Sequence, residues 1–214
     1  MTIQITPELL KAACGPYARY AKSEVMGPLC NAMNVLFPAA QINTAKRIAA
    51  FVGEGMVETN YFQTLQENGN AKYFARYNNR RDLGNGPTDG PTFHGRGIFQ
   101  ITGRSNYTTY AKKLGIDIVN HPDLAATADV GTKIAILFWN DRGLSLKADA
   151  WDILGIATKI NGRNKNTGLP NGWSERKRGS ALALQYLDAH THDQLAMNDN
   201  DFCPAPVDLM AMTA

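Results

Sequence analysis

Helical stretches with recognisable start and stop signals fill most of this 214-residue sequence. Thr6-Pro7 starts the first stretch, because threonine is a good N-cap and proline fits the first helical turn. Gly15-Pro16 ends it, and Gly27-Pro28 is expected to break or kink the second stretch. Capping signals and apolar spacing predict helices over residues 7–14, 18–37, 44–58, 71–77, 105–114, 128–141, 148–160 and 173–189. The chain is therefore expected to be mainly α-helical.

One short piece departs from this helical pattern. Ile98–Thr102 is apolar and β-prone, and we expect a small strand or extended segment there. A strand would place Gln100 and Thr102 on the same face. The preceding residues, 78–97, are rich in asparagine, glycine and proline and are expected to form a long loop. Loops of this length in a compact domain are usually functional or mobile.

The composition is that of one globular domain. Hydrophobic residues make up 44% of the chain and charged residues 19%, which are ordinary values for such a protein. The net charge of +3 is too small to indicate nucleic-acid binding, and it is compatible with an anionic polymer such as a bacterial cell wall. We expect a single domain over residues 1–214, with a helical N-terminal region (1–40) packed on the core and a tail (190–214).

No pattern for a metal, a cofactor or a membrane span is present. The widely spaced Cys14, Cys30 and Cys203 form no CxxC pair, so buried free thiols are expected, and one Cys14–Cys30 bridge stays open. The four histidines do not form a ligand set. The N-terminus lacks the basic and apolar regions of a signal peptide. No apolar run approaches the ~18 residues of a membrane span, so stable membrane insertion is not expected.

Two glutamates lie at the end of the predicted helix over residues 44–58. Glu54 and Glu58 are four residues apart and share one face of the helix. Neither has a lysine or arginine at helical spacing toward its C-terminal side, and two negative charges there oppose the helix dipole. Such locally unfavourable arrangements tend to occur at functional sites. Glu58 is therefore a candidate general acid, and a solvated surface glutamate is the simpler alternative.

A second carboxylate follows on the next loop. Glu67 comes nine residues after Glu58, across a break in the helix. Inverting hydrolysis of a glycosidic bond needs two carboxyl groups about 6.5–9.5 Å apart, with a water between the base and the sugar. Glu67 can supply the second of these groups from the opposite wall of a cleft. The pattern alone favours the simpler interpretation, in which Glu67 is an ordinary surface glutamate on a loop.

Uncharged polar side chains follow Gly95. Gln100, Thr102 and Asn106 present amide and hydroxyl groups that suit sugar hydroxyls, N-acetyl groups or an attacking water. A polar outer face on an edge strand, with Thr102 as an N-cap, explains them equally well. Asn161 and Arg176 can close the far end of the same cleft. A helix C-cap and a solvated helix face are the simpler interpretations for these two.

Four stretches together carry a resemblance to a known family: Phe51–Phe62, Asn78–Gly84, Gly95–Tyr107 and Lys159–Gly162. They resemble glycoside hydrolase family 19, and the likeness is closest to its phage-type endolysin branch. The most specific part is the block that runs from Gly95 through Gln100 and Thr102 to Tyr107. The resemblance covers about residues 44–187, which would form the glycosidase core.

The resemblance implies a lysozyme-like, two-lobed helical domain whose cleft is lined by the small extended segment. It also implies hydrolysis of β-1,4 links next to N-acetylglucosamine-type sugars, with inversion and without a cofactor. The family's catalytic acid falls on Glu58, its second carboxylate on Glu67, and the residue that helps to hold the water on Thr102. The substrate-binding positions fall on Gln100, Asn106, Tyr107, Asn161 and Arg176.

Two residues depart from the family pattern. The residue before the catalytic glutamate is usually histidine and is Val57 here, which removes a hydrogen-bonding neighbour of the acid. Glu54 stands where glutamine is common and adds a negative charge one helical turn from Glu58. Both changes favour a protonated acid.

The main hypothesis is a lysozyme-type endolysin that degrades peptidoglycan glycan strands as a monomer. The lack of a signal peptide fits storage in the cytoplasm and release to the wall in the periplasm, and export by a secretion machine fits the same facts. Three alternatives stay open: a chitinase on N-acetylglucosamine polymers, a non-catalytic wall-binding protein with the same fold, and a lytic transglycosylase, which needs one acidic residue. Val57 is the feature that keeps the binding protein open.

Overall fold

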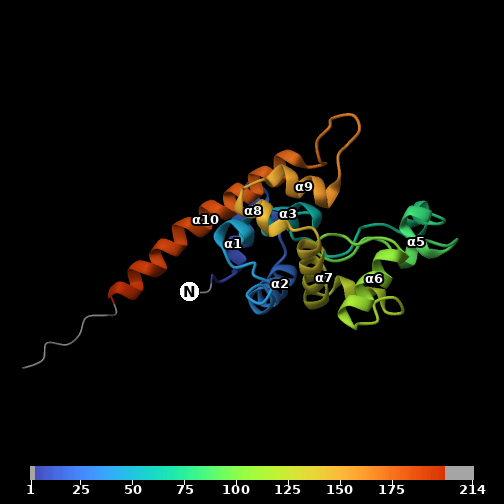
Figure 1. Cartoon of the computed structure of the whole chain (residues 1–214), viewed down its shortest axis with the longest axis horizontal. Coiled ribbons are helices and arrows are strands. Elements are labelled where there is room, and N and C mark those ends of the chain that lie inside the picture. The colour runs from blue at the N-terminus through green and yellow to red at the C-terminus, as the bar shows by residue number, and fades with distance from the viewer. Residues whose placement is uncertain (1–2, 201–214) are drawn as a thin grey trace, which may run out of the picture.

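The computed structural model describes residues 3–200 of the chain and is mainly helical (Figure 1). The longer helices are α1 (Pro7–Cys14), α2 (Ser23–Leu36), α3 (Ala45–Glu58), α6 (Arg104–Leu114), α7 (Ala128–Asp141), α9 (Ile153–Asn161) and α10 (Trp173–Asn200). Shorter helical pieces connect them: η1 (Gly15–Tyr20), α4 (Ala71–Phe74), η2 (Ala75–Tyr77), η3 (Arg81–Leu83), α5 (Asp89–Thr92), η4 (Pro122–Ala126) and α8 (Leu144–Asp149). Within residues 3–200 the only β pairing consists of the isolated bridges Gln66–Arg96 and Arg96–Ile101. The predicted helical class is confirmed.

Helix α3 is the centre of the main core. Every residue from Ile48 to Met56 is buried, because α1, α8, α9 and α10 all pack against this helix. Its contact with α10 is the most extensive in the molecule. A Cβ atom on Gly53 would lie 2.5 Å from the backbone nitrogen of Ser180, and one on Gly179 would lie 3.6 Å from Cα of Gly53. The two glycines therefore let the helix backbones touch directly.

Two separate hydrophobic clusters give the domain its two lobes. The larger cluster combines residues of α1, α2, α3, α8 and α10. The smaller one is built around Phe93, Tyr107 and Tyr110, together with Ala125 of η4. Helix α7 contributes to both, since Val130 and Ile134 belong to the smaller cluster and Ala135, Ile136 and Trp139 to the larger, while the partly buried Phe138 packs against both. In Figure 1, α5 and α6 lie on the side away from α1 and α10.

The capping signals place several helix ends correctly. Thr6, Thr44 and Thr127 each accept a hydrogen bond from the backbone of the first turn that follows, as N-caps do. Gly15 ends α1 with φ 54°, a conformation that is cheap for glycine. These three helices begin and end within a residue or so of the ranges expected from the sequence.

Two expected helices are divided differently. The interruption in the second stretch falls at residues 21 and 22, and α2 continues through Pro28. The hydrogen bond that Pro28 cannot donate would reach the carbonyl of Glu24, an exposed residue of the first turn where water can replace it. The stretch predicted over 148–160 is two helices, α8 and α9. Asp152 caps α9 by accepting a hydrogen bond of 2.8 Å from the backbone of Gly155.

The remaining structural expectations concern thiols, membranes and the tail. Cys14 and Cys30 are buried free thiols, so the open Cys14–Cys30 bridge is not formed, and Cys203 lies outside the described residues. No described helix is long and apolar enough to cross a membrane. The tail predicted over 190–214 begins within α10, which runs to Asn200, and residues 201–214 lie outside the described part.

The close packing of α3 on α10 predicts a large effect for one added methyl group. Gly53→Ala would push its Cβ against the backbone of Ser180, and overpacking of this kind costs about 3 kcal/mol of unfolding free energy. Urea denaturation of the purified variant measures the change. Gly27→Ala is the matched control, because a Cβ there meets nothing within 4 Å and should change stability by less than about 1 kcal/mol. Equal effects at both positions would contradict the close helix contact.

Candidate active site

Glu58 is the last residue of α3, and the chain turns sharply after it. Thr59 closes the helix by donating its hydroxyl to the carbonyl of Gly55 at 2.7 Å. Asn60, Tyr61 and Phe62 then adopt left-handed φ values of 50°, 60° and 56°, which are uncommon for residues other than glycine. The turn leaves the Glu58 side chain 14% exposed at the edge of a buried helix.

Arg176 of α10 binds both glutamates of α3. Its Nη2 donates to Oε1 of Glu58 at 2.5 Å, and its Nη1 donates to Oε2 of Glu54. The guanidinium is only 2% exposed, so Arg176 lies beneath Glu58 and does not present an open binding surface. This contact places one positive charge between the two carboxyl groups that the sequence shows on one face of α3. Charge spacing within that helix could not reveal it, because the partner belongs to the last helix.

Glu54 is fully buried and incompletely hydrogen-bonded. Its side chain has no exposed surface, and its Oε1 has no hydrogen-bond partner among the described residues. Burial raises the pKa of Glu54 to about 7, and the neighbouring charge of Arg176 opposes this rise. A buried carboxyl that lacks water resists ionisation. Glu54, Arg176 and Glu58, which we call the carboxylate–arginine cluster, therefore carry a strong charge coupling at the end of α3.

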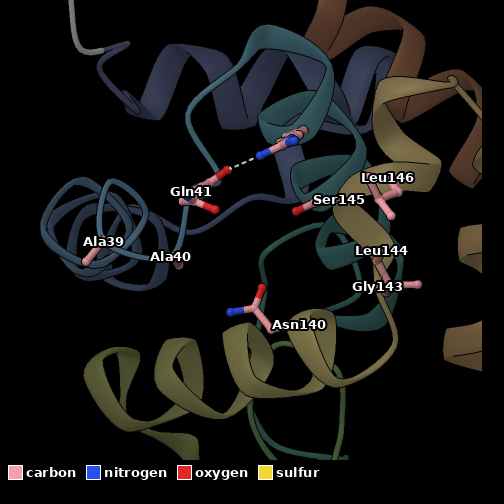
Figure 2. A pocket seen from close by; sticks show the side chains of 9 residues that line it. Ala39, Ala40, Gln41, Asn140, Gly143, Leu144, Ser145 and Leu146 are labelled. Carbon is pink, nitrogen blue, oxygen red and sulfur yellow. Dashed lines mark hydrogen bonds between the residues drawn. The ribbon is translucent and has the colours of Figure 1, made fainter.

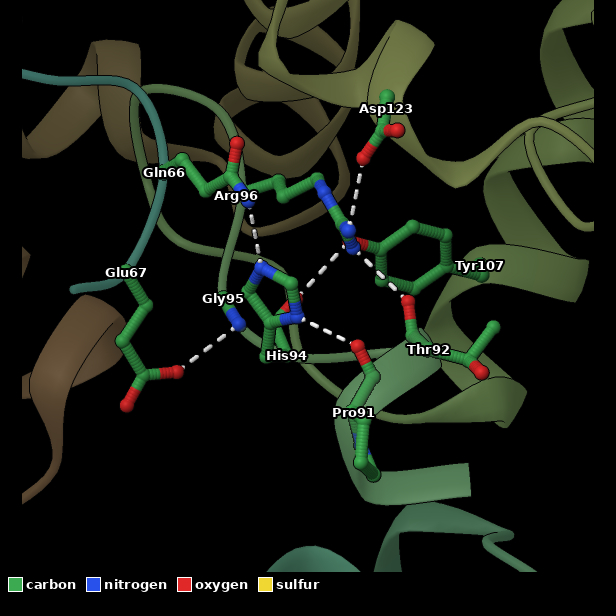
Figure 3. Close-up of polar contacts among 9 residues, drawn as sticks. All are labelled: Gln66, Glu67, Pro91, Thr92, His94, Gly95, Arg96, Tyr107 and Asp123. Carbon is green, nitrogen blue, oxygen red and sulfur yellow. Dashed lines mark hydrogen bonds and ion pairs between the residues drawn. The ribbon is translucent and has the colours of Figure 1, made fainter. Parts of the chain in front are cut away.

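Glu67 is held by three hydrogen bonds on the next loop. Oε1 accepts from Nη2 of Arg76 at 2.8 Å and from the hydroxyl of Tyr77 at 2.9 Å. Oε2 accepts from the backbone nitrogen of Gly95 at 3.0 Å (Figure 3). The backbone nitrogen of Glu67 donates in return to the carbonyl of Gly95 at 2.8 Å. An ionised carboxylate offers about four lone-pair positions, so this arrangement leaves one for a further donor such as water.

The segment expected to be a strand is a tight turn. Arg96 and Ile101 exchange backbone hydrogen bonds of 3.2 and 2.9 Å, and Gln100 between them has φ 51°. The prediction of an extended segment with Gln100 and Thr102 alternating on one face is therefore wrong. The hydroxyl of Thr102 donates to the carbonyl of Gln100 at 3.0 Å, and the amide of Asn106 donates to the carbonyl of Thr102 at 2.8 Å. The turn still brings these polar residues together.

Gly95 is the point at which two predicted site residues meet. A Cβ atom on Gly95 would lie 2.8 Å from Oε1 of Gln100 and 3.1 Å from Oε2 of Glu67. The same turn packs against α3, because a Cβ on Gly55 would lie 3.0 Å from Cγ2 of Ile98. The Gly95 turn thus contacts both the Glu67 loop and α3.

Behind this turn lies a buried polar scaffold that the sequence did not reveal. Nη1 of Arg96 donates to the carbonyl of Thr92 at 2.8 Å and to the hydroxyl of Tyr107 at 2.9 Å, and Nη2 donates to Asp123 at 2.8 Å. The hydroxyl of Tyr107 donates to the carbonyl of His94 at 2.9 Å (Figure 3). Tyr107 is fully buried, and this position does not support its predicted contact with substrate. It instead fixes the backbone beside Gly95.

His94 completes the scaffold. Its ring stacks on Phe74 at 4.2 Å, and its two nitrogens lie 2.8 Å from the carbonyl of Pro91 and 2.9 Å from the amide nitrogen of Gln66. Burial lowers the pKa of His94, so the neutral ring can accept from Gln66 while donating to Pro91. Gln66 immediately precedes Glu67, and His94 thereby helps to fix the Glu67 loop.

Asn161 and Arg176 are linked through the loop between α9 and α10. The side-chain oxygen of Asn161 accepts from the backbone of Asn171 at 2.9 Å, and the carbonyl of Asn171 accepts from Nε of Arg176 at 2.9 Å. The Val57 side chain packs on the same loop, since a Cβ on Gly172 would lie 3.0 Å from its Cγ1. Asn161 and Arg176 are thus connected through Asn171, and Arg176 in turn connects this loop to Glu58; their predicted contacts with substrate stay predictions.

A hollow of about 460 Å³ lies at the opposite end of α3 (Figure 2). Arg47 lines it, but its guanidinium is already bound to Asp149 and to the carbonyl of Gln41. Arg47 and Glu58 are eleven residues apart on one helix, which corresponds to about 16 Å. This hollow is therefore separate from the candidate active site. Among the side chains that the structure describes, those of residues 3–190, no three of His, Cys, Asp or Glu are grouped so that they could hold a metal ion.

Comparison with known proteins identifies the family. A family described as class I chitinase, glycoside hydrolase family 19, matches residues 12–155, which is more than half of the chain. The chain belongs to glycoside hydrolase family 19. The match begins earlier than the predicted core of 44–187 and ends before Asn161 and Arg176. The family recognised from Glu58 and the Gly95–Tyr107 block is confirmed.

The relatives in this family include plant and bacterial proteins. An acidic 27 kDa endochitinase of Solanum lycopersicum is 39% identical over 95 residues, which are 44% of this chain and 36% of that protein. A glycosyl hydrolase family 19 domain-containing protein of Haemophilus influenzae is 39% identical over 89 residues, or 40% of this chain and 42% of the relative. The chain therefore matches about two-fifths or less of the length of these relatives.

Solved structures show the same fold. Chitinase C from Streptomyces griseus HUT6037 has a TM-score of 0.68 at 18% identity, covering 87% of this chain and 77% of that one. A class IV chitinase from Zea mays has a TM-score of 0.57 at 22% identity, covering 76% and 80%. The predicted lysozyme-like helical fold of family 19 is confirmed.

The burial of Glu54 makes the stability of the fold depend on pH. Its pKa is about 7 in the folded protein against an ordinary 4.5, so between these values the folded state binds more protons than the unfolded state. Stability must then fall as the pH rises from about 4.5 to about 7. Relative to Glu54→Gln, the wild type should lose on the order of 2–3 kcal/mol over this window. Urea denaturation at both pH values measures this, and parallel changes in the two proteins would contradict it.

Proposed function

We propose that this protein is a glycosidase that hydrolyses β-1,4 glycosidic bonds of bacterial peptidoglycan by acid and base catalysis with inversion. The observation that carries the proposal is that two carboxyl groups, Glu58 and Glu67, are held by separate hydrogen-bond networks on elements that pack together. Two positioned carboxyl groups are the equipment that this reaction needs. Family membership supports the reaction class.

In the proposed reaction, Glu58 donates a proton to the leaving glycosidic oxygen. Glu67 accepts a proton from the attacking water, with the hydroxyl of Thr102 as a further contact for that water. The three donors on Glu67 orient its carboxylate and leave room for one more. Gln100, Asn106 and Asn161 are proposed to bind the sugar, and Asn106 and Asn161 are exposed. At the end of a turnover, Glu67 releases the proton it gained to solvent, and Glu58 takes up a proton from solvent. Both carboxyl groups thereby return to their starting forms.

Peptidoglycan is the proposed substrate because the Gly95–Tyr107 block resembles the endolysin branch of the family. The net charge of +3 also favours association with an anionic wall polymer. Chitin is the second candidate, since the relatives from Solanum lycopersicum and Streptomyces griseus are named an endochitinase and a chitinase. Comparing release of sugar from purified peptidoglycan and from soluble chitin oligomers distinguishes the two.

We also propose that the protein acts as a monomer and without nucleic acid or stable membrane insertion. It would be held in the cytoplasm until it is released to the wall in the periplasm. Fractionation of producing cells before and after permeabilisation of the inner membrane tests the location. Sedimentation of the purified protein tests the monomer.

The first test of the function is the products formed from purified peptidoglycan. We expect wild-type protein to release muropeptides with reducing ends and Glu58→Gln to release none above background, because the amide has no acidic proton to donate. Mass spectrometry after borohydride reduction identifies the new sugar end. Circular dichroism shows whether the variant is folded, and Asp188→Asn, an exposed change on α10, is the matched control.

Each other outcome selects one of the alternatives. Anhydro-sugar ends would indicate a lytic transglycosylase. Binding of both proteins to the wall without any soluble product would indicate a non-catalytic binding protein. Full activity of the folded Glu58→Gln protein would overturn the assignment of the acid.

The contacts of Glu67 predict a role for the Tyr77 hydroxyl. Tyr77→Phe removes one donor from the carboxylate, and loss of a hydrogen bond to a charged group costs roughly 1.5–3 kcal/mol. We expect kcat to fall by about one to two orders of magnitude with little change in thermal stability. Tyr73→Phe is the matched control, because its half-exposed ring supports Arg76 by stacking at 3.8 Å and phenylalanine keeps that contact. Equal losses in both variants would argue against the role of the Tyr77 hydroxyl.

A further inference from the structure

The hollow at the N-terminal end of α3 has no part in the proposed reaction, yet three separate segments build it. Gln41 lies in the turn before α3, Asn140 in the last turn of α7 and Ser145 in the first turn of α8, and all three line the hollow. In Figure 2 the amide of Asn140 and the hydroxyl of Ser145 point into the space between these segments. The volume of about 460 Å³ is large enough for a small ligand.

The polar groups of the hollow are uncharged and partly unpaired. The side-chain amides of Gln41 and Asn140 make no hydrogen bond to any described residue, and both residues are exposed. Each amide offers one carbonyl acceptor and two N–H donors. The hydroxyl of Ser145 accepts from Nε1 of Trp139 at 3.0 Å and still has its own proton to donate. The hollow therefore presents both donors and acceptors to the hydroxyl and amide groups of a ligand.

An apolar surface adjoins these polar groups. Leu146 is 74% exposed and lines the hollow beside the buried Leu144, with Ala39 and Ala40 on the other segment. A single exposed leucine is ordinary on a protein surface. Here it lies next to three polar side chains that face the same space, and apolar contacts combined with a few convergent polar groups are typical of a ligand site.

The one charged residue among the described residues that line the hollow already has a counter-charge. Nε and Nη2 of Arg47 donate to the two carboxylate oxygens of Asp149 at 2.8 and 2.6 Å, and Nη1 donates to the carbonyl of Gln41 at 2.7 Å. An anionic ligand would have to compete with Asp149 for this guanidinium. The hollow therefore favours a neutral ligand, because the free carboxyl groups of a peptide would find no unpaired cation in it.

The same arginine holds the turn that carries Gln41. Gln41 has φ 57°, a left-handed conformation that costs energy for a residue other than glycine. Its carbonyl is bound by Arg47, and its backbone nitrogen donates to the carbonyl of Pro38 at 3.1 Å. Backbone held in such a conformation is found most often at functional sites. Because the turn is already formed, a ligand would have to order only the Gln41 side chain.

We propose that this hollow is a second glycan-binding site, which holds an N-acetylglucosamine unit of a strand other than the one in the cleft. Such a sugar is neutral, and it has hydroxyl and N-acetyl groups for the polar side chains of the hollow and C–H groups for Leu146. This inference rests on the proposed function, since the glycan is the polymer that Glu58 would help to cut. The two sites lie at opposite ends of α3, so a second contact with the wall raises the effective concentration of substrate at the cleft.

Titration with the trimer of N-acetylglucosamine tests the binding directly. Backbone amide signals are followed by NMR in Glu58→Gln, so that the trimer is not cut during the measurement. We expect two sets of shifted signals, one from the cleft and one from residues 39–41 and 143–146. In Gln41→Gly/Asn140→Ala both amides are removed and glycine tolerates the left-handed φ, so adding this pair should abolish the second set and keep the first. Shifts confined to the cleft up to the solubility limit of the trimer would overturn the proposal.

The pair Gln41→Gly/Asn140→Ala, with Glu58 intact, should affect insoluble and soluble substrates differently. On insoluble peptidoglycan we expect the initial rate at limiting substrate to fall at least about fivefold, because the second contact with the wall is lost. On short soluble glycan fragments of the same wall, kcat/KM should stay within about twofold, because one fragment cannot occupy both sites. Asn31→Ala removes an exposed, unpaired amide of α2 outside the hollow and is the matched control. Equal losses on both substrates, or no loss on either, would overturn the proposal.

The two experiments separate this proposal from the function on which it rests. Release of sugar by the wild type without any shift at the hollow would overturn only the second binding site. Shifts at the hollow in a protein whose wild type releases no sugar from any glycan would overturn the proposed hydrolysis and support the binding site.

Discussion

The arrangement of the candidate active site depends on one buried guanidinium. Arg176 connects the last helix to two carboxyl groups of α3 and to the loop before α10, so a single side chain joins three segments that are distant in sequence. Its reach depends on the glycines at the α3–α10 contact, because bulkier residues would hold the helices apart. Close packing of the α3 and α10 backbones therefore makes the electrostatic coupling through Arg176 possible.

Much of the fold was predictable because its signals are local. A threonine that accepts a hydrogen bond from the turn after it starts a helix whatever the rest of the chain does, and this holds for Thr6, Thr44 and Thr127. Glycine with left-handed φ ends α1 in the same local way. The family resemblance added what local signals lack, namely that Glu58 and Glu67 belong to one site. The structure shows their elements in contact, and their catalytic roles remain predictions.

The failures have a common physical origin in long-range contacts. The turn at Gln100 forms because Arg96 pairs with Ile101 and Gln66, and β propensity over five residues cannot report such pairing. Tyr107 is a polar residue in the block that carries the family resemblance, yet its hydroxyl bonds to Arg96 and to the carbonyl of His94 inside the protein. The partner of Glu54 and Glu58 lies more than a hundred residues away. Charge spacing along α3 alone indicates repulsion between Glu54 and Glu58, whereas in the structure Arg176 pairs with both.

Helix α7 gives the two lobes a shared wall. Val130 and Ile134 belong to the smaller hydrophobic cluster, Ala135, Ile136 and Trp139 belong to the larger one, and Phe138 packs against both, with no break in the helix between them. Loss of order in either hydrophobic cluster would expose apolar side chains of α7. The lobes are therefore expected to melt as one cooperative unit, with similar hydrogen-exchange protection at both ends of α7.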